Sequence, residues 1–278
     1  MEEKKSFFEL LDSKSAMIFG GVGGLLVLCT IGFFVMLGLV FGGKIKLGGS
    51  AVVAYDASGQ PAAQAPTTPP ANIPKTAKPV VELFVMSYCP YGLQMQKAYL
   101  AAWKLLGSKA DMSVKYVDYA MHGKKEVDEN TRQYCIGKDQ PTKLIAYLEC
   151  FSGKDDYVAC LKEAGVNESK VSSCVASTDK QFGITAKYDD QSSWLSGRYP
   201  IYPVHADLNE KYGVQGSPTL IINGVEAQVG RTSEAVKQAI CAGFENAPAE
   251  CSQTLTNVNF DSGFGWTTGS GATAAECK

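Results

Sequence analysis

The sequence predicts an α/β domain in which a buried strand brings a cysteine to the start of a helix. The apolar, β-branched run that begins at Val80 ends abruptly at Cys89-Pro90-Tyr91-Gly92 and continues with helical periodicity. Residues 112–119 alternate as a second strand, and a strand–helix–strand unit of this length implies a right-handed crossover with parallel strands. In Gly216-Ser217-Pro218-Thr219-Leu220-Ile221-Ile222-Asn223-Gly224, a proline leads into a short strand that turns at Asn-Gly.

Cys89 is the candidate reactive residue, because we expect it at a helix N-terminus. The unpaired N–H groups and the positive end of the helix dipole stabilise a thiolate there, and the thiolate is the nucleophilic form of cysteine. A single cysteine can also be a small apolar core residue. The proline at the first helical position, Pro90, and the later Pro218 favour a reactive thiol.

These motifs resemble those of the thioredoxin-fold thiol–disulfide oxidoreductases. The resemblance implies that Cys89 is the nucleophile and that Pro90, Tyr91 and Gly92 complete the active-site motif. It also implies that Pro218 follows a cis peptide bond and that Ser217, Pro218 and Thr219 form the loop that receives an extended substrate peptide.

The chain departs from that family at Gly92. A dithiol enzyme of this fold carries a second cysteine there and uses it to resolve the mixed disulfide, but the sequence contains no Cys-x-x-Cys pair. Related folds also place a carboxylate six residues before the nucleophile, where this chain has Leu83. Glu82 is one position away and is therefore expected on the other face of the strand.

A helical insertion is expected over about residues 121–199. A thioredoxin fold interrupted in this way resembles the DsbA family. The insert is also similar to the gamma-interferon-inducible lysosomal thiol reductase family, although that family has a cysteine shortly before the His-Gly pair, where this chain has Ala120 and Met121. The residues that carry this similarity are His122, Gly123, Glu126, Asn130, Gln133, Cys135, Tyr147, Leu148, Cys150 and Phe151.

Cysteine usage indicates an oxidising compartment, since eight of the nine cysteines follow residue 80. We expect structural disulfides among Cys135, Cys150, Cys160 and Cys174, with the pairing left open. Cys241 on the last helix is expected to pair with Cys251 just beyond it.

Other classes of site have little support in the sequence. The net charge is −2 and there is no basic cluster, so a nucleic-acid partner is not expected. Two histidines without a Cys-x-x-Cys pair argue against zinc, and no metal or cofactor is predicted. His122 and His205 are interpreted as packed or solvated rather than as bases. Asn167-Glu168-Ser169 fits a glycosylation sequon, a triplet that is common by chance.

The N-terminal region predicts a single membrane anchor. Residues 1–15 form a charged cytoplasmic tail, and Ala16–Phe41 are 26 residues without a charge, which predicts a transmembrane helix over 16–42. A cleaved signal peptide is the alternative, disfavoured by the length of the apolar run. Gly20 and Gly24 have the spacing that brings two membrane helices together, so a homodimer is one expectation. Cysteine usage places the C-terminal part outside the cytoplasm.

The remaining boundaries follow from composition. Residues 43–78 are a Pro/Ala-rich linker, the thioredoxin-like domain is expected over 79–251, and the Gly-, Ser- and Thr-rich residues 252–278 are expected to be disordered. Cys277 on this tail is a candidate resolving thiol for Cys89. The alternative is that it has no role or pairs between chains.

The sequence therefore predicts a membrane-tethered, extracytoplasmic thiol–disulfide oxidoreductase or isomerase that uses one cysteine. Its expected partners are cysteine-containing proteins and a membrane redox partner, and the direction of the redox reaction is not indicated. The alternative is a non-catalytic module that holds extended peptides at Ser217-Pro218. Gly92 favours the module, whereas Cys89 with Pro90 favours the enzyme.

Overall fold

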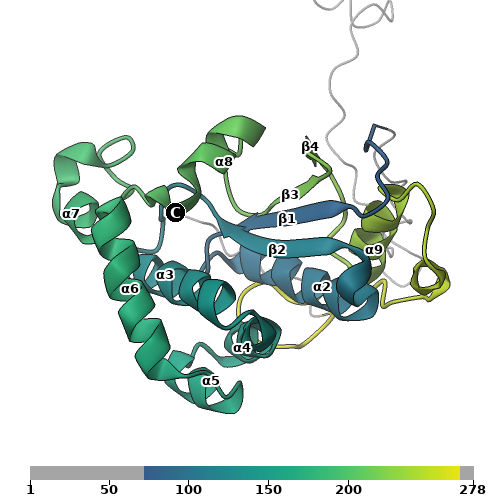
Figure 1. Ribbon diagram of the computed structural model, residues 1–278, viewed down its shortest axis with the longest axis horizontal. Coiled ribbons are helices and arrows are strands. Elements are labelled where there is room, and N and C mark those ends of the chain that lie inside the picture. The colour runs from purple at the N-terminus through teal and green to yellow at the C-terminus, as the bar shows by residue number, and fades with distance from the viewer. Residues whose placement is uncertain (1–71, 270–278) are drawn as a thin grey trace, which may run out of the picture. The chain divides into compact units, whose positions relative to one another are not determined.

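The computed structural model describes residues 72–269 (Figure 1). The predicted membrane helix at 16–42, Gly20, Gly24 and Cys277 all lie outside the described residues. Within 72–269, no helix is long and apolar enough to cross a membrane.

A mixed four-stranded sheet with the order β2-β1-β3-β4 forms the centre of the described domain. β1 (Val80–Val85) pairs in parallel with β2 (Asp111–Tyr116), as the strand–helix–strand unit predicts. On its other side β1 pairs antiparallel with β3 (Thr219–Ile222). β3 and β4 (Val225–Glu226) form the hairpin predicted at Asn-Gly, where both turn residues have positive φ values.

Helices cover both faces of the sheet (Figure 1). α2 (Pro90–Leu106) and α9 (Ser233–Ala242) pack together on one face, against the alternate β1 side chains Val81, Leu83 and Val85. α8 (Ala206–Tyr212) contributes Leu208 and Tyr212 to a smaller apolar cluster on the opposite face. This cluster contains Phe84, Met86, Cys89, Val117, Val214 and Ile221.

The sheet order and the helices on its two faces define a thioredoxin-like fold. The cap predicted for the last helix is present, since the Thr232 hydroxyl accepts a hydrogen bond from the Ala235 N–H at 3.1 Å. Short 3₁₀ turns occur at Gly107–Lys109, Gln191–Ser193, Pro203–His205 and Ala249–Ser252.

The segment between β2 and α8 is a helical insert, as predicted. Its helices are α3 (Lys124–Asp139), α4 (Pro141–Lys154), α5 (Tyr157–Glu163), α6 (Glu168–Phe182) and α7 (Ile184–Asp189). Cys135 of α3 is bonded to Cys174 of α6, and Cys150 of α4 to Cys160 of α5. Beyond the insert, Cys241 is bonded to Cys251, the pairing expected from the sequence.

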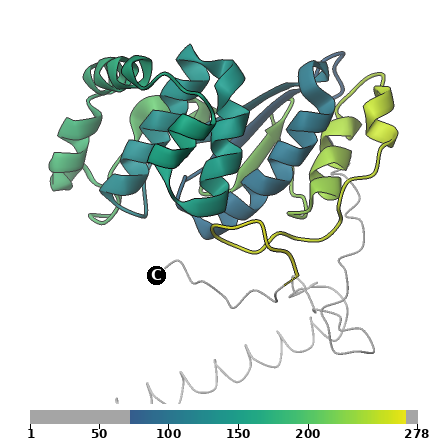
Figure 2. The same ribbon diagram turned by 90° about the horizontal axis from the view of Figure 1, so that it is seen from below.

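The chain beyond Cys251 is ordered as far as Gly269, which corrects the expected disorder of 252–278 for this part. We call residues 252–269 the C-terminal strap. The Lys97 ammonium of α2 is completely buried and donates hydrogen bonds of 2.7–2.9 Å to the carbonyl oxygens of Asp261, Gly263 and Gly265. Figure 2 shows the yellow strap running along the helices on the side away from the sheet.

The amino-acid composition of the strap did not indicate that it is ordered, because only a few of its residues bind Lys97 or pack an aromatic ring against the domain. Phe264 packs edge-on against Phe151 of α4, with ring centroids 5.4 Å apart. The Gly265 N–H donates to the Ser152 carbonyl oxygen at 2.9 Å. A Gly- and Ser-rich segment can therefore be ordered by one buried cation and a few aromatic rings, although its average hydrophobicity is low.

The domain also begins before Pro79. Ile73 is buried, and Thr76 exchanges two backbone hydrogen bonds of 2.9 Å with Gly243 and Glu245. The last residues of the predicted linker therefore belong to the domain.

Candidate functional site

Cys89 lies where the sequence placed it, at the N-cap of α2. Its Sγ accepts a hydrogen bond from the Gly92 N–H at 3.4 Å, and the thiol donates to the Ser217 carbonyl oxygen at 3.5 Å. Pro90 occupies the first helical turn. Cys89 is 4% exposed and is the one free cysteine in the part of the chain that the structure describes.

The predicted proline loop faces this cysteine. The Ser217–Pro218 peptide bond is cis, and the Ser217 hydroxyl accepts a hydrogen bond from the Met86 N–H at 2.9 Å. The Thr219 hydroxyl donates to the Gly216 carbonyl oxygen at 2.9 Å, which closes the loop as β3 begins. The structure therefore brings together two motifs that are 128 residues apart in the chain.

Gly92 is closely surrounded in the folded site. A Cβ atom at this position would lie 2.5 Å from Ser217 Oγ, and 3.2 Å from both Cys89 Cβ and the Met86 carbonyl oxygen. A separation of 2.5 Å is shorter than any normal contact between carbon and oxygen. The space that a second active-site side chain would need is thus partly filled by the Ser217 hydroxyl.

Aromatic side chains surround the site. Arg231 lies over the Tyr91 ring, with its guanidinium carbon 4.8 Å from the ring centroid. The Tyr119 hydroxyl donates to the Gln215 carbonyl oxygen at 3.0 Å. Burial, followed by the nearby charge of Asp118, raises the pKa of Tyr119 above its ordinary value.

Sequence reasoning missed a buried acid that binds the turn before Cys89. Glu126 of α3 is 0% exposed, and its Oε2 accepts a hydrogen bond from the Tyr88 N–H at 3.1 Å. Oε2 also lies 2.6 Å from His122 Nδ1. No local pattern indicated this contact, because Glu126 lies on α3 and binds an amide 38 residues earlier in the chain.

The other groups considered as acids or bases lie elsewhere. Glu82 is paired with Lys115 of β2, at 3.7 Å between Oε1 and Nζ. His205 is packed against the Tyr116 ring, and its Nδ1 accepts the Tyr116 N–H at 3.1 Å. Burial, assisted by the nearby charge of Lys115, lowers the pKa of His205 to about 3, which keeps the ring neutral.

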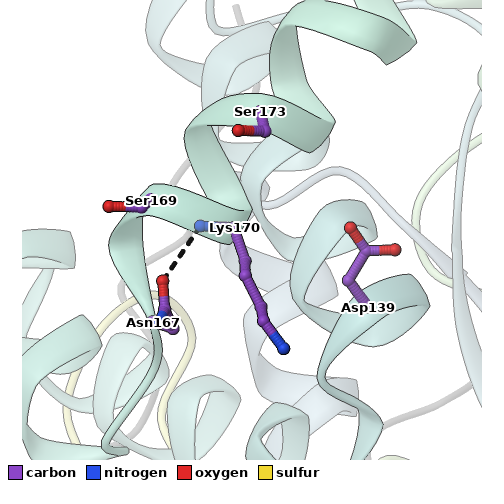
Figure 3. A pocket seen from close by; sticks show the side chains of 5 residues that line it. All are labelled: Asp139, Asn167, Ser169, Lys170 and Ser173. Carbon is purple, nitrogen blue, oxygen red and sulfur yellow. Dashed lines mark hydrogen bonds between the residues drawn. The ribbon is translucent and has the colours of Figure 1, made fainter.

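Two surface pockets belong to the insert and are not lined by Cys89. One of about 570 Å³ lies between the end of α3 and the start of α6, where Asn167 Oδ1 caps α6 by accepting the Lys170 N–H (Figure 3). The sequon asparagine is therefore exposed and acts as a helix cap. The second, of about 560 Å³, has an apolar floor that includes Val127, Leu161 and Val171. The described residues contain no cluster of three or more potential metal ligands.

Comparison with known proteins gives structural similarity without sequence similarity. No model of a known protein family matches the chain, and no curated protein matches it. Reduced DsbA from Mycobacterium tuberculosis is 16% identical, with 66% of this chain and 94% of that chain covered and a TM-score of 0.46. DsbG from the same organism is 17% identical, with 66% and 89% covered and a TM-score of 0.45. Oxidised BdbD from Bacillus subtilis is 16% identical, with 62% and 92% covered and a TM-score of 0.42.

The chain is similar to these solved structures in its backbone fold. The assignment of a thioredoxin-like fold rests on the chain's own sheet order and on the placement of Cys89 against the cis Ser217–Pro218 bond.

Proposed function

We propose that the protein is a thiol–disulfide oxidoreductase or isomerase that acts on cysteine-containing proteins through Cys89. One observation carries this proposal: a free cysteine caps a helix and lies 3.5 Å from the carbonyl oxygen that precedes a cis-proline. A helix N-terminus favours the thiolate. The backbone of the proline loop can form hydrogen bonds with an extended peptide, as the edge of a sheet does with an added strand.

The reaction needs only one thiol of this protein, and each exchange step breaks one S–S bond as it forms another. The Cys89 thiolate attacks one sulfur of a substrate disulfide, and the substrate S–S bond breaks as the mixed disulfide forms. The departing sulfur leaves as a thiolate and takes a proton from solvent. A second thiol then attacks the mixed disulfide. If a thiol of the substrate attacks the substrate sulfur, Cys89 leaves as a thiolate and the result is isomerisation. If a small external thiol attacks Cys89 Sγ, the substrate sulfur leaves as a thiolate and the substrate is reduced, and a second external thiol then frees Cys89 with formation of an external disulfide.

The close packing around Gly92 supports single-thiol chemistry. A cysteine at position 92 needs the Ser217 hydroxyl to move away from the Met86 N–H. We expect Gly92→Cys alone to cost about 1–3 kcal/mol of stability by overpacking. Gly92→Cys combined with Ser217→Ala has room for the thiol. We expect this double variant to form a disulfide between Cys89 and the introduced cysteine more completely than the single variant, as measured by mass spectrometry after alkylation. Equal disulfide formation in the two variants would show that Ser217 does not exclude a second thiol.

The test of the reaction is capture of the mixed disulfide. The full-length protein in detergent is incubated with a disulfide-containing peptide, quenched with acid and digested, and we expect the peptide on Cys89. Cys89→Ser should abolish the adduct. The alternative, a peptide-binding module, is favoured by the 4% exposure of Cys89. In that case the Cys89→Ser protein would still bind the peptide and the wild-type protein would form no adduct.

Cys277 is proposed as one source of the resolving thiol. Gly263 donates its N–H to the Pro90 carbonyl oxygen at 2.9 Å, so the strap returns the chain to the start of α2. Cys277 follows fourteen residues later in the sequence. A stretch of this length spans up to roughly 48 Å when extended. Cys277→Ser should prolong the mixed disulfide, and an unchanged lifetime would end this assignment.

The membrane anchor is a further part of the proposal. Its support is the uncharged run Ala16–Phe41, together with cysteine usage typical of an oxidising compartment. We expect the full chain to remain in the membrane fraction after extraction at alkaline pH. We also expect the folded domain to be accessible to a protease added to the extracytoplasmic side. Release by alkaline extraction would contradict the anchor, and protection from that protease would contradict the orientation.

A further inference from the structure

The turn before Cys89 is held by side chains from distant parts of the chain. Three consecutive backbone N–H groups, those of Met86, Ser87 and Tyr88, each donate a hydrogen bond to a side-chain oxygen. The acceptors are Ser217 Oγ at 2.9 Å, Asn130 Oδ1 at 3.1 Å and Glu126 Oε2 at 3.1 Å.

We propose that Glu126 and Asn130 of α3 are positioning residues for Cys89, a role that rests on the proposed thiol chemistry. The two residues are four apart on a helix and therefore lie on the same face. Consecutive amides of an irregular turn have no ladder or helix partner of their own, so side chains must supply the acceptors. The insert thus takes part in the active site by fixing the backbone that carries the thiol.

The acceptors are themselves held in place. Both Glu126 and Asn130 are 0% exposed. Glu126 Oε1 accepts the N–H groups of Met121 at 2.8 Å and His122 at 3.2 Å, while Oε2 also contacts the His122 ring. A carboxylate with this many partners has one orientation, so the position of Tyr88 follows from that of α3.

Only one of the two polar groups of the Asn130 side chain forms a hydrogen bond within the described residues. Its Oδ1 binds the Ser87 N–H, whereas its Nδ2 is buried without a partner in the part of the chain described here. An unpaired buried amide N–H destabilises the folded state. An asparagine that served stability alone would be a poor choice at this position, which favours a role in holding the turn.

The helix contains a matched control for each residue. Glu129 and Gln133 are also buried on α3, but their side chains bind each other and Arg132, Tyr147 and Tyr116 rather than a backbone amide of the Cys89 turn. A role in stability alone therefore predicts similar effects from either pair. A positioning role predicts that only Glu126 and Asn130 affect Cys89.

The experiment measures the second-order rate of Cys89 with a small aromatic disulfide, using the full-length protein under conditions where each variant is folded. Asn130→Leu is compared with Gln133→Leu, and Glu126→Gln with Glu129→Gln, with circular dichroism to confirm folding. We expect the rate to fall about tenfold in Asn130→Leu and Glu126→Gln, the size expected from losing one hydrogen bond to a positioned group. The two control variants should stay within about twofold of the wild type.

Each outcome separates this inference from the proposed function. A wild-type Cys89 that exchanges no faster than the unfolded chain would overturn the proposed function itself. Normal wild-type exchange with equal rates in the turn variants and their controls would overturn only the positioning role. A faster rate in Glu126→Gln would also overturn it for Glu126, because removal of the negative charge would then be the dominant effect.

Discussion

The thioredoxin-like core and the helical insert are stabilised in different ways. The core is built on a sheet whose central strand, β1, buries apolar side chains on both faces, such as Leu83 and Phe84. The insert has no sheet strand of its own, and two disulfides connect its helices in pairs. In the insert, disulfides thus link elements that are not joined by the backbone hydrogen bonds of a sheet.

Both regions also bury charged side chains, and in the insert the buried charge is part of a network. Glu129 is 0% exposed and lies between Arg132, Gln133 and the Tyr147 hydroxyl. Burial raises the pKa of Glu129, while the Arg132 charge and the hydrogen bonds from its neighbours oppose this shift. Such a network is costly to break, because removing one partner leaves the other buried without compensation.

The largest effect is expected in the core. Phe84→Ala removes a ring that is 0% exposed and packs edge-on against Tyr212, so we expect a loss of about 3–5 kcal/mol. Val80→Ala, on the same strand but 45% exposed, is the matched control and should change stability by about 0.5 kcal/mol or less. Urea denaturation monitored by circular dichroism measures both. Similar losses would mean that β1 is not the centre of the core.

Next in size are the disulfides of the insert. The Cys135–Cys174 bond closes a separation of 39 residues and the Cys150–Cys160 bond one of 10. Loop entropy predicts that replacing the first pair with alanine costs about 4 kcal/mol and the second about 3 kcal/mol. Hydrogen exchange shows where the loss falls: we expect α3 and α6 to lose protection before β1. Equal loss of protection in β1 would show that core and insert unfold as one unit.

The strap provides a smaller, pH-dependent test, because it contacts both regions. Burial lowers the pKa of Lys97 to about 8, with the charge of Asp261 acting in the opposite sense. Between pH 8 and about 10.5 the unfolded chain therefore binds more protons than the folded one, so stability rises with pH over this range. The total gain is at most on the order of 3 kcal/mol, because one pKa unit corresponds to about 1.4 kcal/mol.

Lys97→Met removes this titration. We expect the stability of the variant to be nearly flat between pH 8 and about 10.5, whereas the wild type becomes more stable relative to it. Denaturation at several pH values measures the difference, and Lys104→Met, on an exposed part of α2, is the control. A wild type that loses stability relative to Lys97→Met above about pH 8 would show that the three carbonyl oxygens hold the ammonium more strongly than burial disfavours it.

Local patterns predicted most of the fold. The β1 run, the Cys-Pro start of α2, the Asn-Gly hairpin and the Thr232 cap each depend on residues close in sequence, and the structure contains all four. The Cys241–Cys251 bond was predictable for the same reason, as its residues are ten apart at the end of one helix.

The prediction for 252–278 was wrong as far as Gly269 because it used composition. Lys97 is polar and lies in an amphipathic helix, so nothing in its neighbourhood indicates that its ammonium binds three carbonyl oxygens more than 160 residues away. The buried acid was sought on β1, at Leu83, because related folds place a carboxylate six residues before the nucleophile. Glu126 instead reaches the turn from the insert.

The sequence alone determined the parts of the protein that depend on short-range chemistry: a thiol at a helix start, a proline that leads into a strand, and the apolar and alternating runs that form the strands. Only the tertiary structure decided how the site is completed. The Ser217 hydroxyl beside Gly92, the acceptors on α3 for the amides before Cys89, and the strap on Lys97 join residues between 38 and 168 positions apart. Such contacts are set by the packing of whole elements, which no local pattern of residues records.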